Sequence, residues 1–300
     1  MLWLLLTASL LAACKEAPEY RPDLGNQHPR PALWEVTAAN GTGGRAFLFG
    51  TIHLLPEGIG WQDERIDEAV AESDALVLEV TGLEDSRKVS AIFGQLALSP
   101  AGSRPDVLLR LPPDLRDEAR EVADKGGVDL ASLDRMDSWA AALQLASGLH
   151  ADLGLSQDEG VESRLTRQFE ARGKPVLALE SIGYQLGLFD ALSETQQRAL
   201  LRNVIEEADT GRAEFETMLG AWLRGDDTQI DRLSRKGLLA EGPVREILLV
   251  RRNREWAGQI ARQIADGKRV LVAVGAAHLA GADGVPALMR QQGFRVRRMR

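Results

Sequence analysis

The chain has 300 residues, of which 44% are hydrophobic and 27% are charged, a balance typical of a globular protein with one large α/β domain. Its formal net charge of −8 and isoelectric point near 5.2 argue against the basic face that a nucleic-acid partner requires. A single cysteine excludes an intramolecular disulfide and any cluster of thiolate metal ligands.

Residues 1–14 form an apolar segment, too short to span a bilayer as a helix, that ends in Leu11-Ala12-Ala13-Cys14. The segment resembles a bacterial lipoprotein signal, in which Cys14 becomes the lipidated first residue of the mature protein. No Lys or Arg precedes the apolar run, so a plain secretory signal or a misassigned start codon stays an alternative. We predict a periplasm-facing lipoprotein of the cell envelope, with the outer membrane as one candidate, or a secreted protein if Cys14 is not lipidated.

Residues 15–33 are rich in Pro, Glu, Asn and Gln and predict a flexible tether, which leaves 34–300 as the folded domain. Four short apolar runs in this domain have the profile of buried parallel strands, at residues 46–49, 75–78, 176–179 and 270–274. Helical patterns are found at residues 61–72, 113–124, 137–149, 160–172, 193–208, 212–224 and 243–266, and a last short strand at 294–299. This alternation predicts an α/β fold with a central, mostly parallel sheet and helical insertions.

The glycine-rich residues 40–44 precede a strand and do not follow one, so they predict a hairpin turn and not a phosphate-binding loop. No Gly-x-Gly-x-x-Gly, Walker-type loop or Cys-x-x-Cys occurs in the sequence. Nucleotide-binding and zinc-ribbon functions therefore lack their signatures.

Polar residues follow each of the four buried strands. The chain has four histidines, and two of them end a Gly-x-x-His motif placed directly after an apolar run, at Gly50–His53 and Gly275–His278. Glu79 and Glu180 follow the second and third strands. Ligands of open α/β sheets bind beyond the carboxyl ends of the strands, so we expect these four side chains to converge there. We expect Gly50 and Gly275 to let the backbone turn sharply.

Imidazoles and carboxylates are suitable ligands for Zn, Mn or Co, and a metal with an open position lowers the pKa of bound water enough to attack a carbonyl. The sequence predicts His53, His278 and Glu79 as ligands, with Glu180 as a further ligand or general base. Without a metal, the same residues supply a histidine base oriented by a glutamate. Against both readings, a single histidine after a strand is more often a satisfied loop residue.

Two further groups support a site. Arg252 or Asn253 on the long helix of residues 243–266 is expected to point inward toward a carboxylate or an oxyanion, while Arg251 and Arg254 are expected to solvate its surface. Glu162, at a helix start, adds a carboxylate, although acids at helix N-termini are common for electrostatic reasons alone.

These segments resemble the TraB/GumN family of bacterial proteins, which is related to the Tiki metalloproteases and more distantly to erythromycin-esterase-like proteins. The resemblance covers residues 34–300 and rests on segments in family order: 48–56, 76–79, 160–162, 174–181 with Gln185, 252–253, and 274–281 with Gly293. It implies two related α/β halves, each with a Gly-x-x-His motif, and implies His53, His278 and Glu79 as metal-site or catalytic residues. Glu162 departs from the aspartate of many relatives.

Together these features predict a metal-dependent hydrolase, peptidase-like, held at a bacterial membrane by the lipid on Cys14 and acting on a peptide or small molecule. The alternative is a non-enzymatic lipoprotein that binds a ligand or metal at the same place. A metal-independent esterase with His53 as base is a third hypothesis, but no Gly-x-Ser-x-Gly elbow supplies its nucleophile.

Overall fold

The computed structural model describes residues 28–100, 102–240 and 242–300. The predicted signal segment, its Cys14 and the tether as far as residue 27 lie outside these residues. Strand β1 begins at Leu33, the last residue assigned to the tether. No helix in the described part of the chain is long and apolar enough to cross a membrane.

The described strands form one six-stranded sheet in the order β4-β3-β5-β2-β1-β6. Their bounds are β1 Leu33–Thr37, β2 Arg45–Thr51, β3 Ala75–Leu78, β4 Val176–Ala178, β5 Arg269–Gly275 and β6 Arg295–Arg298. Neighbouring strands are parallel from β4 to β2, whereas β1 pairs antiparallel with both β2 and β6. The α/β class and the mostly parallel sheet are confirmed, and residues 38–44 form the turn of the β1–β2 hairpin. The two related halves stay a prediction.

Helices occupy most of the remaining chain. The α-helices are α1 Glu64–Glu72, α2 Ser86–Ala97, α3 Arg116–Gly126, α4 Leu130–Leu133, α5 Ser138–Asp152, α6 Val161–Ala171, α7 Ile182–Asp190, α8 Glu194–Glu206, α9 Gly211–Leu223, α10 Asp227–Leu233, α11 Gly242–Arg245, α12 Arg251–Ala265 and α13 Val285–Gln291. Short 3₁₀ helices lie at Val107–Arg110, Pro113–Leu115, Gly237–Ala240 and Ala276–Leu279, and a π-helical turn at Glu246–Val250 joins α11 to α12.

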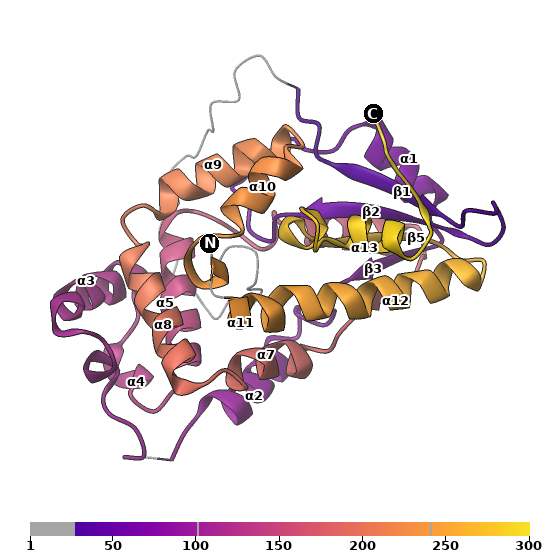
Figure 1. Cartoon of the computed structure of the whole chain (residues 1–300). Helices are drawn as coiled ribbons and strands as arrows, with labels where there is room; N and C mark the ends of the chain where they lie inside the picture. The colour runs from indigo at the N-terminus through magenta and orange to yellow at the C-terminus, as the bar shows by residue number, and fades with distance from the viewer. Residues whose placement is uncertain (1–27, 101, 241) are drawn as a thin grey trace.

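The two faces of the sheet belong to different hydrophobic cores. Along β2, Phe47 and Phe49 join a large core with α1, α6 and the inserted helices, and the alternate residues Ala46 and Leu48 join a smaller core with α12 and α13. Figure 1 shows α12 and α13 lying along the sheet, while α3, α4, α5 and α8 gather away from it as a helical insertion. The sheet is therefore covered on both sides, as parallel sheets require.

The sequence missed strand β1 and helices α2, α7 and α10. The segment predicted as a helix at residues 243–266 is helical from Gly242 to Ala265, and the π-helical turn Glu246–Val250 within it changes the helical phase just before Arg251 begins α12. Turns of this kind are frequent at functional sites. Arg252, which follows the turn, reaches the carboxyl ends of β3 and β4, where it donates to Glu79 and Glu180.

The carboxyl ends of β2, β5, β3 and β4 share one edge of the sheet because these strands are parallel neighbours. Neither Gly50 nor Gly275 has a positive φ, so neither glycine is needed for a left-handed backbone conformation. A Cβ on Gly50 would lie 3.1 Å from Cα of Ala276, and the indole N–H of Trp222 donates to the Gly50 carbonyl at 2.7 Å. Gly50 is thus required by close packing at the strand end.

Candidate functional site

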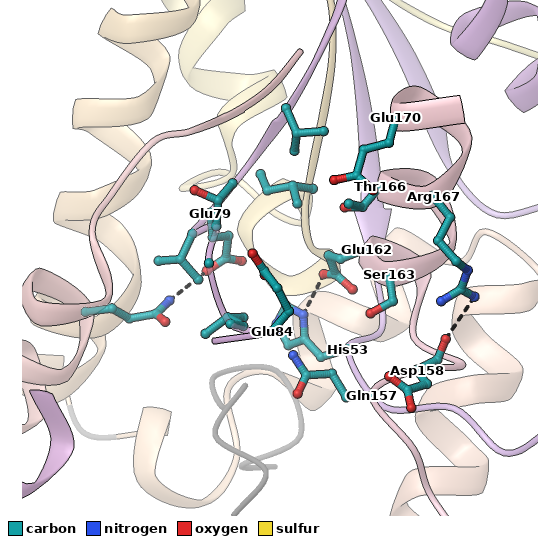
Figure 2. A pocket seen from close by; sticks show the side chains of 17 residues that line it. His53, Glu79, Glu84, Gln157, Asp158, Glu162, Ser163, Thr166, Arg167 and Glu170 are labelled. Carbon is teal, nitrogen blue, oxygen red and sulfur yellow. Dashed lines mark hydrogen bonds and ion pairs between the residues drawn. The ribbon is translucent and has the colours of Figure 1, made fainter. Parts of the chain in front are cut away.

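A pocket of about 610 Å³ opens at this edge of the sheet. It is lined by His53, the segment that continues from the end of β3, the loop before α6 and one face of α6, together with Val176 and Gln185. Figure 2 shows His53 and Glu79 at one end and the side chains of α6 along one wall. The side chains of α6 that line the pocket are Glu162, Ser163, Thr166, Arg167 and Glu170, whose spacing of three and four residues defines a single helix face.

His53 is held by Glu162 from the first turn of α6. Its Nδ1 lies 2.5 Å from Glu162 Oε1, and the hydroxyl of Thr51 donates to the same oxygen. The His53 side chain is 4% exposed and that of Glu162 18%. An ionised Glu162 accepts the Nδ1 proton and leaves Nε2 as the basic nitrogen of the ring.

Backbone contacts fix the position of α6 under His53. The amide of Val161 donates to the Ile52 carbonyl at 3.2 Å, and Leu55 and Ser156 exchange two hydrogen bonds of 3.1 and 3.0 Å. A Cβ on Gly160 would lie 2.0 Å from the His53 carbonyl oxygen, so no larger residue fits there without movement. The fold itself therefore holds Glu162 against His53, without help from a ligand.

Glu79 lines the same pocket but both of its oxygens are engaged. Oε1 accepts from the Gly275 amide at 2.8 Å, and Oε2 accepts from Arg252 at 2.7 Å and from Gln185 at 3.1 Å. Burial opposes ionisation, but His278, Arg252 and His53, together with the Gly275 amide, outweigh it and lower the pKa of Glu79 to about 2. Glu79 is thus a fixed anion at neutral pH.

Arg252 lies behind Glu79, and its side chain is 1% exposed. Nε donates to Glu180 at 2.9 Å, Nη2 donates to Glu79 at 2.7 Å and to Glu180 at 2.8 Å, and Nη1 donates to the Leu248 carbonyl at 3.0 Å. The second donor of Nη1 faces His278 Nε2 at 3.2 Å. All five N–H groups of the guanidinium therefore have an acceptor.

His278 is fully buried, in the 3₁₀ turn after β5. The amide nitrogen of Asn253 donates to the Asp283 carbonyl at 2.8 Å, so the Asn253 oxygen faces His278 Nδ1 at 2.5 Å and accepts its proton. The remaining lone pair, on Nε2, accepts from Arg252. Burial lowers the pKa of His278 to about 3 in spite of nearby Glu79, so the ring is neutral at neutral pH.

Glu180 completes this buried cluster. Its side chain is 3% exposed and also accepts from the indole N–H of Trp256 at 2.8 Å. Burial raises the pKa of Glu180 even though Arg252 and Trp256 donate to it. The Trp256 ring packs on His278 with 4.4 Å between ring centroids.

The residues predicted from the sequence thus fall into two sets that share Glu79. His53, Glu79 and Glu162 line the pocket, whereas Glu180, Arg252, Asn253 and His278 do not. Arg251 and Arg254 are exposed, as expected. Thr51 and Trp256 also belong to these two sets, and the sequence did not predict either of them as a site residue. Trp256 follows Arg252 by four residues on the buried face of α12, a spacing that could have revealed it.

The predicted metal ligands do not fit an ion as they are arranged. Within residues 28–300, residues 101 and 241 aside, no three His, Cys, Asp or Glu side chains are grouped to hold one metal. The Nε2 lone pair of His278 and both oxygens of Glu79 already accept hydrogen bonds. The divalent ion therefore stays a prediction.

Comparison with known proteins gives one family. Residues 32–298 match the family model described as TraB/PrgY/gumN. The chain is 24% identical over 267 residues to "Uncharacterized protein YbaP" of Escherichia coli K12, a match that covers 89% of this chain and 94% of that protein. The YbaP protein of Shigella flexneri is 23% identical over 266 residues with the same coverage. No solved structure matches the chain.

The buried carboxylate of Glu79 makes stability depend on pH. The pKa of Glu79 is lower in the folded chain, about 2, than the ordinary value of 4.5, so the ionised group stabilises the fold above pH 4.5 and this contribution is lost as pH falls toward 2. We expect Glu79→Gln to lower the free energy of unfolding by about 3 kcal/mol at pH 7, because the variant leaves Arg252 with one carboxylate fewer. Urea titrations from pH 7 to pH 3 should show the gap to the parent narrowing below pH 4.5. A gap that is constant with pH would contradict the ionised state of Glu79.

Proposed function

The chain belongs to the TraB/PrgY/gumN family, and from this membership and the geometry of the site we propose that it is a hydrolase that cleaves a peptide-like substrate in the pocket. The observation that carries the proposal is the 2.5 Å contact between His53 and Glu162 at the pocket wall. A carboxylate on Nδ1 sets the tautomer and orientation of an imidazole that acts as a general base through Nε2.

In this proposal water is the nucleophile. His53 takes a proton from water at Nε2 while the water oxygen bonds to the substrate carbonyl carbon and the π electrons of the carbonyl move onto its oxygen. The C=O double bond then re-forms as the bond to the leaving nitrogen breaks, and His53 returns the proton to that nitrogen. Glu162 holds the imidazole throughout, and the fixed charge of Glu79 stabilises the imidazolium that forms between the two steps.

The proposed role of His53 as general base is tested with paired variants. We expect His53→Gln and Glu162→Gln to lower kcat for a cleaved peptide by about 10²- to 10⁴-fold with an unchanged fold, since general-base catalysis contributes that much. His28→Gln and Glu159→Gln are matched controls, because neither side chain lines the pocket. The measurement is turnover of a quenched fluorescent peptide library, with circular dichroism as the check on folding.

Cleavage by His53→Gln at the parent rate would overturn His53 as the base. If the parent binds peptides but cleaves none of them, the chain is a non-enzymatic ligand-binding protein.

The charge of the pocket points to a basic substrate. Among the described residues, its lining includes five carboxylates and one arginine, Arg167: the acids are Glu79, Glu84, Asp158, Glu162 and Glu170. Arg167 itself donates to the Asp158 carbonyl. Opposite charge favours encounter and orientation more than it adds raw affinity. We therefore propose that peptides with Lys or Arg near the cleaved bond are preferred.

We expect a lysine-containing peptide to have a KM roughly tenfold below that of its glutamate counterpart at low salt, and the double variant Glu84→Gln/Glu170→Gln to reduce this ratio to about threefold or less. Both side chains are exposed and lie on the pocket rim, so the variant should keep its stability. The double variant Glu121→Gln/Asp124→Asn, on the exposed face of α3, is the control. A KM ratio that is the same in both double variants would count against the proposal.

We also propose that the lipid on Cys14 anchors the chain in the cell envelope with the pocket facing the periplasm. Its support is the sequence of residues 1–14. We expect the parent to incorporate labelled palmitate and to sediment with membranes, and Cys14→Ala to lose the label and become soluble. Ser9→Ala, within the same segment, should behave as the parent. Membrane-bound, unlabelled parent protein would contradict the anchor.

A further inference from the structure

The buried cluster behind the pocket already contains a cation. The guanidinium of Arg252 lies among two carboxylates and an imidazole, with Glu79 at 2.7 Å, Glu180 at 2.8 Å and His278 Nε2 at 3.2 Å. These three side chains are also the donor types that a divalent ion would choose. The guanidinium therefore competes directly with a metal for the same oxygens and the same lone pair.

The cluster is built for a planar guanidinium. Nε and Nη2 form a forked pair of bonds to Glu180, at 2.9 and 2.8 Å, which matches the bidentate geometry of arginine with carboxylate. The Leu248 carbonyl accepts one further N–H from within the same helical segment. The Trp256 ring lies against the guanidinium, with the central carbon 4.7 Å from the ring centroid.

The His278 ring is held with its proton on Nδ1, which leaves Nε2 to accept from Arg252. Asn253 takes the Nδ1 proton of His278, and the Asp283 carbonyl determines which way the Asn253 amide faces. The His278 lone pair is thereby directed at Arg252. A divalent ion placed on that lone pair would lie beside a permanent positive charge in a buried, low-dielectric site, which is unfavourable.

We infer that Arg252 takes the place of a divalent ion in this cluster, so that the second Gly-x-x-His motif of this chain serves a guanidinium and not a metal. Arg252, Asn253 and His278 are then positioning residues, which hold Glu79 at the pocket wall. The inference concerns the buried cluster alone, so it stands whether or not the pocket hydrolyses peptides.

Removal of the guanidinium should expose the hidden metal site. The full-length parent, Arg252→Ala, His278→Ala, the double variant Arg252→Ala/His278→Ala, His53→Ala and the surface control Arg254→Ala are purified in detergent and incubated with an excess of Mn²⁺, Co²⁺ or Zn²⁺. After desalting, bound metal is measured by inductively coupled plasma mass spectrometry and thermal unfolding is followed with and without the ion. Both readouts are independent of catalysis.

We expect the parent and Arg254→Ala to retain no metal in the cluster and to unfold at an unchanged temperature when metal is added. Arg252→Ala should unfold at a lower temperature without metal, since it leaves two carboxylates unpaired, and should regain roughly 5–10 °C with a saturating ion. The double variant should lose that gain. Arg254 is exposed and pairs with Glu246 at the surface, so it controls for loss of an arginine from the same helix.

Stoichiometric metal in the parent that is lost in His278→Ala would overturn the inference. So would a folded Arg252→Ala that binds no metal. If Arg252→Ala fails to fold, the parent and His278→Ala still decide between the two cations. Metal that is kept by His278→Ala but lost in His53→Ala would place the ion in the pocket and leave Arg252 as the cation of the cluster.

Discussion

The arrangement of the whole site depends on a charged guanidinium that is almost completely removed from water. Taking Arg252 and two carboxylates out of solvent costs several kcal/mol per ion, which only close geometry and complete hydrogen bonding can offset. All five N–H groups of Arg252 are satisfied by groups from the ends of β3, β4 and β5 and from the turn before α12. These four segments must therefore meet in one place for the chain to fold, and their meeting fixes one end of the pocket.

The two histidines of the repeated motif have opposite environments although their strands are neighbours in the sheet. His53 is held by α6, which packs on the core that contains Phe47 and Phe49, and His278 is held by α12, which packs on the other face. The registers differ as well, since Gly50 pairs with Val274 and Thr51 with Gly275. One motif thus lines a cavity while the other closes a buried network, and the sequence alone gives both the same appearance.

The parts of this site that depend on strand order could be predicted from the sequence. Short apolar runs located the four parallel strands, and the rule that ligands bind beyond their carboxyl ends drew attention to His53, Glu79, Glu180 and His278. The pairing of Glu162 with His53 could not be predicted, because it depends on α6 docking against a loop more than a hundred residues away in the chain. The sequence did place Arg252 or Asn253 on the inner face of this helix, but it could not predict that the guanidinium lies between Glu79, Glu180 and His278, because those contacts depend on how the ends of β3, β4 and β5 meet α12.

The different roles proposed for Glu79 and His53 follow from the charge state of Glu79. A general base is most effective when its pKa lies near the working pH. Glu79, with three N–H donors on its oxygens and a pKa of about 2, cannot take a proton from water at neutral pH. Its charge is nevertheless fixed at the pocket wall, which it shares with His53. Of the two groups at that end of the pocket, His53 is therefore the one suited to proton transfer in the proposed hydrolysis, and the buried cluster around Arg252 would act on that reaction through Glu79, the carboxylate that both sets share.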